Sequence, residues 1–325
     1  MTTALITGIT GQDGQHLTAF LIGRGYRIVG IVRDATDWAS RAFASEFPTV
    51  ELVQGDLGDR ASLFAAVEFA QPDEIYNLGG MSSVARSFDQ PELTADITAI
   101  GPLRLLEAIR SVGNAESRFF QASSGEMFGE EGSIARIETD RMAPRSPYAC
   151  SKVFAHNLVS TYRDAYGVFA CSGILFNHEG ERRSREFVTR KITSAVARIS
   201  LGLDDELVLG RLDVSRDWGY AGDYVIAMWK MLQAQRPDDY VIATGETRSL
   251  QDFLECAFGS ANIDNWERYV RLDPQFIRPI DTGVLSGNPA KAGRELGWHP
   301  TVPFDDIVAR MVRHDLALEQ AGIQI

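Results

Sequence analysis

The sequence feature that most constrains the fold is a run of three evenly spaced glycines near the N-terminus. Gly8, Gly11 and Gly14 directly follow the apolar segment 4–7. They open an amphipathic segment with apolar residues at helical spacing, which ends at Gly25. Glycines at such a strand-to-helix turn let backbone amides approach a pyrophosphate at the positive end of a helix. The pattern therefore predicts a βαβ unit that binds a dinucleotide.

Short apolar runs then alternate with amphipathic stretches through the first 180 residues. This alternation is typical of a parallel sheet covered by helices on both faces. We predict an α/β fold of the Rossmann type, with a doubly wound parallel sheet whose strands lie at 4–7, 27–32, 50–54, 74–78, 118–122 and 170–175. The longer helices of this part are predicted at 91–109 and 148–166.

The chain of 325 residues exceeds what one hydrophobic core usually serves, so we expect two domains. Residues 1–176 are predicted to form the cofactor-binding Rossmann domain. The strict alternation ends there, and residues 177–325 are predicted to form mostly a smaller, mixed α/β domain for the substrate. The return of segment 211–245 to the first sheet stays open. The elements expected in the second part are helices at 187–200, 223–233 and 303–318 and strands at 206–209 and 240–244.

Composition and charge exclude several classes of partner. The net charge is −12, and no block of Lys and Arg is dense enough to follow a nucleic-acid backbone. No segment has the roughly 18 uninterrupted apolar residues that span a bilayer, and no basic stretch precedes the first apolar run, so we expect a cytoplasmic protein. The histidines lack zinc-ligand spacing, and we expect no metal. We expect reduced, buried packing thiols at Cys150, Cys171 and Cys256.

Four side chains in the first half carry acid–base chemistry. Tyr148 and Lys152 stand four residues apart in a predicted helix, so they lie on one helix face. A nearby ammonium favours the phenolate, which makes a tyrosine available as a base. Ser124 lies at the end of a predicted strand, and Glu126 adds a second proton acceptor. We predict that these four residues are catalytic, although Glu126 on these grounds is equally open to being a surface carboxylate.

The choice of cofactor is expected to depend on Arg33 and Asp34, just after the second predicted strand. An arginine there accepts the 2′-phosphate of NADP, whereas an acid binds the ribose 2′-hydroxyl of NAD. The Arg33 guanidinium matches a phosphate, and Asp34 would repel it unless it pointed away. We therefore predict NADP and leave NAD open. Asp56 follows a later strand, where it is placed to hold the adenine amino group.

The motifs together resemble a known family. The glycine run with Tyr148 and Lys152 is similar to that of the extended short-chain dehydrogenase/reductases. A narrower resemblance, to the GDP-mannose 4,6-dehydratase family, covers nearly the whole chain and rests on segments 4–14, 121–129, 144–148, 173–179, 187–192 and 216–219.

The resemblance implies an enzyme that removes water from GDP-mannose through an internal redox cycle. Tyr148 would take the proton of the hexose 4-hydroxyl while hydride passes to the nicotinamide. Glu126 would remove the carbon 5 proton as the 6-hydroxyl leaves as water, and hydride would return to carbon 6 to give GDP-4-keto-6-deoxy-mannose. Lys152 would hold the nicotinamide ribose and lower the pKa of Tyr148. Ser124 stands where the family usually has threonine, and it keeps the hydroxyl.

The resemblance also implies two sets of binding residues. The residues expected to contact NADP are Gly8, Thr10, Gly11, Gln12, Asp13, Gly14, Arg33, Asp56, Leu57, Leu78, Tyr148 and Lys152. Those expected to contact the GDP-sugar are Ser82, Asn177, Val188, Lys191, Arg216 and Arg278. One of the four cations at the nucleotide end is expected to serve a structural ion pair instead; the four are Arg190, Lys191, Arg216 and Arg278. A homodimer or homotetramer is implied as well, with the two long helices in the contact.

The chain departs from the family pattern in three segments. A usually basic loop reads Arg-Asp-Ala-Thr at 33–36, and both 79–82 and 211–218 differ at polar positions. These departures leave a related GDP-hexose or GDP-heptose open as the substrate. A reductase or epimerase on the same fold also stays open, because it would need the tyrosine and the lysine but no base at Glu126. A nucleotide-binding protein without catalysis is disfavoured, since the catalytic residue types are all present.

Overall fold

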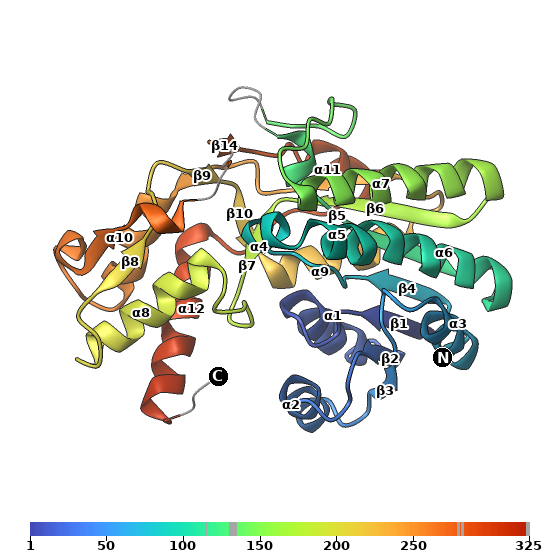
Figure 1. Cartoon of the computed structure of the whole chain (residues 1–325), viewed down its shortest axis with the longest axis horizontal. Coiled ribbons are helices and arrows are strands. Elements are labelled where there is room, and N and C mark those ends of the chain that lie inside the picture. Colours follow the sequence, from blue (N-terminus) through green and yellow to red (C-terminus); the bar gives the residue numbers. More distant parts are fainter. Residues whose placement is uncertain (115, 130–134, 278–279, 281–282, 323–325) are drawn as a thin grey trace.

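A seven-stranded parallel sheet forms the centre of the larger part of the chain (Figure 1). The computed structural model describes residues 1–114, 116–129, 135–277, 280 and 283–322. The strands follow the order β11-β6-β5-β4-β1-β2-β3. Their bounds are β1 (Thr3–Thr7), β2 (Arg27–Val32), β3 (Glu51–Gln54), β4 (Glu74–Asn77), β5 (Arg118–Ser124), β6 (Phe169–Leu175) and β11 (Asp239–Ile242).

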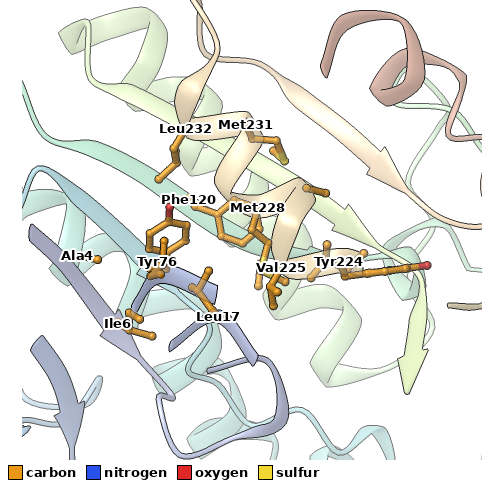
Figure 2. Close-up of a cluster of buried hydrophobic side chains, with 14 of the residues drawn as sticks. Ala4, Ile6, Leu17, Tyr76, Phe120, Tyr224, Val225, Met228, Met231 and Leu232 are labelled. Carbon is orange, nitrogen blue, oxygen red and sulfur yellow. The ribbon is translucent and has the colours of Figure 1, made fainter. Parts of the chain in front are cut away.

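Helices cover both faces of this sheet. One face packs against α1 (Gln12–Ile22), α2 (Trp38–Glu46), α9 (Ala221–Gln233) and α11 (Ala290–Leu296). In Figure 2 the α9 side chains, among them Met228, lie over Tyr76 and Phe120 of the sheet. The other face packs against α3 (Arg60–Ala70), α6 (Gly101–Val112) and α7 (Pro147–Tyr166). The predicted doubly wound α/β fold is therefore confirmed.

The remaining elements form three short sheets and a second helical core. Two of the sheets pair β10 with β7 and β13 with β8, and the third has the order β12-β9-β14. Helices α8, α10 and α12 share an apolar core with Trp218. The bounds are β7 (Asn177–Glu179), α8 (Val188–Ser200), β8 (Leu207–Leu209), β9 (Ser215–Arg216), β10 (Trp218–Tyr220), β12 (Arg248–Ser249), α10 (Leu250–Ser260), β13 (Val270–Leu272), β14 (Val284–Leu285) and α12 (Phe304–Gln320).

The predicted helix over 91–109 is interrupted. It consists of α5 (Pro91–Ala95), one π turn over Asp96–Ile100, and α6, while α4 (Val84–Asp89) precedes it. The amide of Gly101 bonds to the carbonyl of Asp96, five residues back. Pro102 has no amide hydrogen to continue the regular pattern, so the backbone shifts register just before it.

The prediction for the cysteines is wrong at one position. Cys171 is buried and Cys256 is half-buried, but Cys150 is exposed. Tyr148 and Lys152 point inward on α7, and a residue two positions from either points away from that face. Among the helices of the described residues, none is long and apolar enough to cross a membrane.

Candidate active site

A cleft of about 440 Å³ opens where the sheet meets the second group of helices. Its wall includes residues that follow the carboxyl ends of several central strands, where ligands bind in open parallel sheets. Of the residues predicted to bind or react, those that line this cleft are Gly8, Gly11, Gln12, Asp13, Gly14, Leu78, Ser82, Ser124, Glu126, Tyr148, Lys152, Asn177, Val188 and Arg216.

The glycine-rich turn forms one end of the cleft. It packs so tightly against neighbouring backbone that Gly8 and Gly14 have no space for a side chain. Gly8 has a φ of +65°, and a Cβ on it would lie 2.8 Å from the amide nitrogen of Gly79. A Cβ on Gly14 would lie 2.4 Å from the carbonyl oxygen of Ile9. Gly11 precedes α1 and no side chain caps its first amides. These free amides and the positive helix end suit the pyrophosphate of a dinucleotide, so the residues present fit such a cofactor.

The catalytic candidates meet at the centre of the cleft. Ser146 caps α7 by accepting a hydrogen bond from the amide of Ala149 at 3.1 Å, which fixes where the helix begins. Tyr148 and Lys152 then project one turn apart and are 8% and 5% exposed. Ser124 ends β5, and its hydroxyl hydrogen-bonds to Tyr148.

Glu126 lies in the short 3-10 turn that follows Ser124, with its side chain at the cleft. The amide of Glu126 donates to the Ser124 hydroxyl at 3.2 Å, which closes this turn. Both proton-accepting side chains, Glu126 and Tyr148, therefore face the same cavity.

The pKa of Tyr148 differs from the sequence-based expectation. Burial raises it to about 12, and the hydrogen bond with Ser124 opposes this only in part. Burial also lowers the pKa of Lys152 to about 8. The Lys152 ammonium donates to the carbonyl of Ala122 at 2.6 Å and stands 5.7 Å from the Tyr148 ring centre. In this arrangement loss of hydration therefore outweighs the groups that lower the Tyr148 pKa, and the expected contribution of Lys152 stays a prediction.

A buried ion pair at the cleft was not foreseen. His178 Nε2 lies 2.9 Å from a carboxylate oxygen of Asp13, and the other ring nitrogen bonds to the carbonyl of Phe176. Burial would raise the pKa of Asp13, but the His178 imidazole lowers it well below its usual value. Burial would likewise lower the pKa of His178, and Asp13 raises it above its usual value. The pair joins the glycine-rich turn to β7, so one charged contact bridges the two halves of the cleft.

The far end of the cleft is lined by Asn177, Val188 and Arg216, from β7, α8 and β9. Phe276 also lines it, and the Lys191 ammonium stands 4.3 Å from that ring centre. Phe276 was not predicted to lie here, because a lone aromatic residue in a short 3-10 turn carries no periodic signal. Arg278, which was predicted to bind here, lies outside the described residues.

Several predicted binding residues do not line the cleft. Arg33 is exposed. Asp34 accepts hydrogen bonds from the amide and hydroxyl of Thr36, and Asp56 accepts one from the amide of Gly58. Leu57 packs in the core beneath α3 and α6. Thr10 and Lys191 are also absent from the cleft wall.

Arg190 is a structural cation and not part of the cleft wall. It is 3% exposed and its Nε lies 2.7 Å from a carboxylate oxygen of Asp315, which is fully buried on α12. Its Nη1 also donates to the carbonyls of Glu181 and Arg183. The expectation that one cation of this group serves an ion pair is met by Arg190. In the parts of the chain that the structure describes, no cluster of three or more acidic, histidine or cysteine side chains could hold a metal.

A parallel sheet with a glycine-rich turn and a Tyr-x-x-x-Lys pair in one cleft defines an enzyme of the extended short-chain dehydrogenase/reductase class. The solved structure of UDP-glucose 4-epimerase from Thermus thermophilus, in complex with NAD, matches with a TM-score of 0.85 and 26% identity, over 97% of this chain and 99% of that one.

Sequence comparisons narrow the class to one family. The model of the family described as GDP-mannose 4,6 dehydratase matches residues 5–311. GDP-mannose 4,6 dehydratase 2 of Arabidopsis thaliana is 48% identical over 326 residues, which cover 97% of this chain and 87% of the relative. GDP-mannose 4,6-dehydratase of Yersinia enterocolitica is 43% identical over 350 residues, which cover 97% and 94%. The chain belongs to the GDP-mannose 4,6-dehydratase family.

Proposed function

We propose that this chain converts GDP-mannose to GDP-4-keto-6-deoxy-mannose by removing water. The observation that carries the proposal is that Ser124, Glu126, Tyr148 and Lys152 line one cleft together with the glycine-rich turn. Membership of the family and its curated relatives support the same reaction. Two proton-accepting side chains in one cavity favour dehydration over a simple alcohol oxidation, which needs one base.

Tyr148 and its neighbours perform the first proton transfer. A nicotinamide cofactor bound at the glycine-rich turn would accept hydride from carbon 4 and, after water has left, return it to carbon 6 while carbon 5 regains a proton. Tyr148 takes the proton from the 4-hydroxyl of the hexose, and Ser124 hydrogen-bonds the same oxygen. Lys152 would hold the cofactor ribose, and its positive charge would stabilise the phenolate in the assembled site.

Glu126 performs the second proton transfer. Once carbon 4 carries a ketone, the hydrogen on carbon 5 is acidic, and the carboxylate of Glu126 removes it as a proton and passes it to the 6-hydroxyl, which leaves as water. Arg216 and the first turn of α8 would bind the nucleotide diphosphate, where the local positive charge offsets the net charge of the chain. Lys191 does not line the cleft itself, but its ammonium stands over Phe276, which does, and it would add a further positive charge beside the diphosphate.

We propose NADP as the cofactor, held by Arg33 through the 2′-phosphate. Replacing Arg33 with Ser should weaken NADP binding by about ten- to hundredfold, the scale of a lost charge-assisted hydrogen bond, and should change NAD binding little. Isothermal titration of both cofactors measures this. Equal losses for the two, or tighter binding of NAD by the unmodified chain, would assign the preference to Asp34.

We also propose a homodimer or homotetramer that buries the surface of α5 and α7. Leu93 and Phe154 on these helices are 48% and 45% exposed, and their burial in a contact would remove that apolar surface from water. Light scattering at micromolar concentration tests this, and a monomer mass would contradict it.

Mass spectrometry after incubation with GDP-mannose tests the proposed reaction. The expected product is lighter than the substrate by one water, with no net change in the absorbance of the reduced cofactor. A reductase would instead consume added NADPH in proportion to product, and a binding protein would leave the sugar unchanged. A panel that includes other GDP-hexoses and a GDP-heptose identifies the sugar, since segments 79–82 and 211–218 depart from the family pattern.

A further inference from the structure

The carboxylate of Asp217 is fully buried between β9 and β10 and has an unusual set of partners. One oxygen accepts hydrogen bonds from the amide and the hydroxyl of Thr244, at 2.8 and 2.7 Å. The other accepts from the amides of Gly245 and Gly287, at 2.9 and 3.4 Å. These donors are neutral, so the cost of burying the charge is offset by hydrogen bonds that tie separate loops together.

The three loops that Asp217 joins come from distant parts of the sequence. One carries Asp217 itself, one follows β11 and includes Thr244 and Gly245, and one follows β14 and includes Gly287. The amide of Asp217 also donates to the carbonyl of Leu285 in β14 at 3.1 Å. The carboxylate and the backbone of this residue therefore fix the strand segment on which they lie.

The neighbouring residue, Arg216, is the one that reaches the cleft. It pairs with Leu285 of β14 on one side and with Arg248 of β12 on the other. Its Nη1 donates to the carbonyls of Ser215 and Gly283, at 3.0 and 3.2 Å. The guanidinium is thus held against the backbone of β9 and of Gly283, just before β14, next to the loops that Asp217 joins, and Arg216 lines the cleft.

We propose that Asp217 is a positioning residue that sets the Arg216 guanidinium for the nucleotide diphosphate. This inference rests on the proposed function, in which Arg216 contacts the GDP moiety. Without the four hydrogen bonds, the β9 segment can shift relative to the loops after β11 and β14, and the guanidinium moves with it. A displacement of about 1 Å is enough to weaken a bidentate contact with phosphate oxygens.

A second buried carboxylate provides a matched control. Asp223 at the start of α9 is 4% exposed and accepts hydrogen bonds from the amide and hydroxyl of Thr301 and from the amide of Val302, at 2.7 to 3.1 Å. Its partners do not line the cleft. Asp217→Asn and Asp223→Asn therefore each remove a buried carboxylate that is surrounded by neutral hydrogen-bond donors. Of the two positions, Asp217 is the one that lies next to Arg216.

Calorimetry of each variant with GDP and with NADP separates positioning from general stability. Asp217→Asn should weaken GDP binding by about ten- to hundredfold, because an amide nitrogen would face the amides of Gly245 and Gly287. NADP binding should change less than about twofold, and Asp223→Asn should leave both affinities within that range even if urea unfolding shows a similar loss of stability. Equal loss of GDP and NADP affinity, or equal effects of the two variants, would overturn the proposal.

A double variant shows whether Asp217 acts through Arg216. Arg216→Met should weaken GDP binding, and adding Asp217→Asn should then have little further effect, whereas independent roles would give additive losses. If Asp217→Asn does not fold, Thr244→Val removes one of the four donors and should weaken GDP binding by a smaller factor. Wild-type protein that binds no GDP would overturn the proposed function as well. If the wild-type protein dehydrates GDP-mannose but Asp217→Asn binds GDP as tightly as wild type, the role of Asp217 is overturned and the proposed function stands.

Discussion

Replacing each of two adjacent cations on α8 with Met should have opposite effects on stability and on GDP binding: Arg190→Met should lower stability, and Lys191→Met should weaken GDP binding. Arg190 is 3% exposed, bonds to the fully buried Asp315 at 2.7 Å, and donates to two backbone carbonyls. Replacing it leaves the Asp315 carboxylate buried, and within the described residues its remaining hydrogen-bond partner is the hydroxyl of Thr193. Breaking a buried pair in this way costs about 3–5 kcal/mol, so we expect Arg190→Met to lower the free energy of unfolding by that amount.

Lys191→Met should show the reverse pattern. The Lys191 ammonium is half-buried and stacks over Phe276, so its loss should change the free energy of unfolding by less than about 0.5–1 kcal/mol. GDP binding should weaken by about tenfold or more, because a charge-assisted contact with the diphosphate is lost.

Urea unfolding followed by circular dichroism, with GDP titration calorimetry on the same samples, measures both effects. The control is Arg190→Met combined with Asp315→Leu, which should be more stable than Arg190→Met alone because no carboxylate is left without its partner. A loss below about 1 kcal/mol for Arg190→Met would refute the reasoning. So would a weakening of GDP binding by Arg190→Met that equals the effect of Lys191→Met.

Three further predictions concern the cleft. Glu126→Gln keeps the size of the side chain but removes the base, so product formation and exchange of the carbon 5 proton with heavy water should fall by about a hundred- to ten-thousandfold; near-normal formation of the 4-keto-6-deoxy product would exclude Glu126 as the base. Gly14→Ala should weaken NADP binding by about five- to hundredfold, because its Cβ would press on the Ile9 carbonyl, whereas Gly23→Ala, whose nearest contact is 3.5 Å away, should not; calorimetry with NADP compares them. The pKa of His178 is raised in the folded state, so its ion pair with Asp13 stabilises the fold below the usual imidazole pKa and loses this effect as the pH rises through the raised value. Urea unfolding should therefore show a gap between wild type and His178→Gln that is wide near about pH 6 and narrows at about pH 9, and a gap independent of pH would contradict this.

Local patterns were sufficient to predict the elements that surround the cleft. The predicted strands of the central sheet end within two residues of the observed bounds, and the helix predicted over 148–166 begins one residue earlier, at Pro147. The bounds of strands and helices depend on residues a few positions apart, so the spacing of apolar residues and the helix-capping residues predict them directly. The interruption of the 91–109 helix was missed because a π turn is a single-turn bulge inside a helix, and the residues on both sides of it stay helical.

Long-range partners could not be predicted in this way. Asp13 and His178 are separated by 165 residues, and Arg190 and Asp315 by 125. No periodic pattern connects such positions, and the identity of a partner depends on how the sheet and the second helical core meet. The direction of the Tyr148 pKa shift was missed for a related reason, since burial is its largest cause and the completed fold decides how deeply the phenol is covered.

The position of β11 has a consequence for how the protein is made. This strand forms the edge of the central sheet next to β6, and α9, just before it, covers the apolar face around Tyr76 and Phe120 (Figure 2). A nascent chain that ends near residue 176 would present an unpaired strand edge and a bare apolar surface, both of which promote aggregation. The sheet is complete only when β11 has paired with β6, and this requires that residues up to Ile242 have left the ribosome. The first half of the chain therefore depends on later synthesis for its own folding.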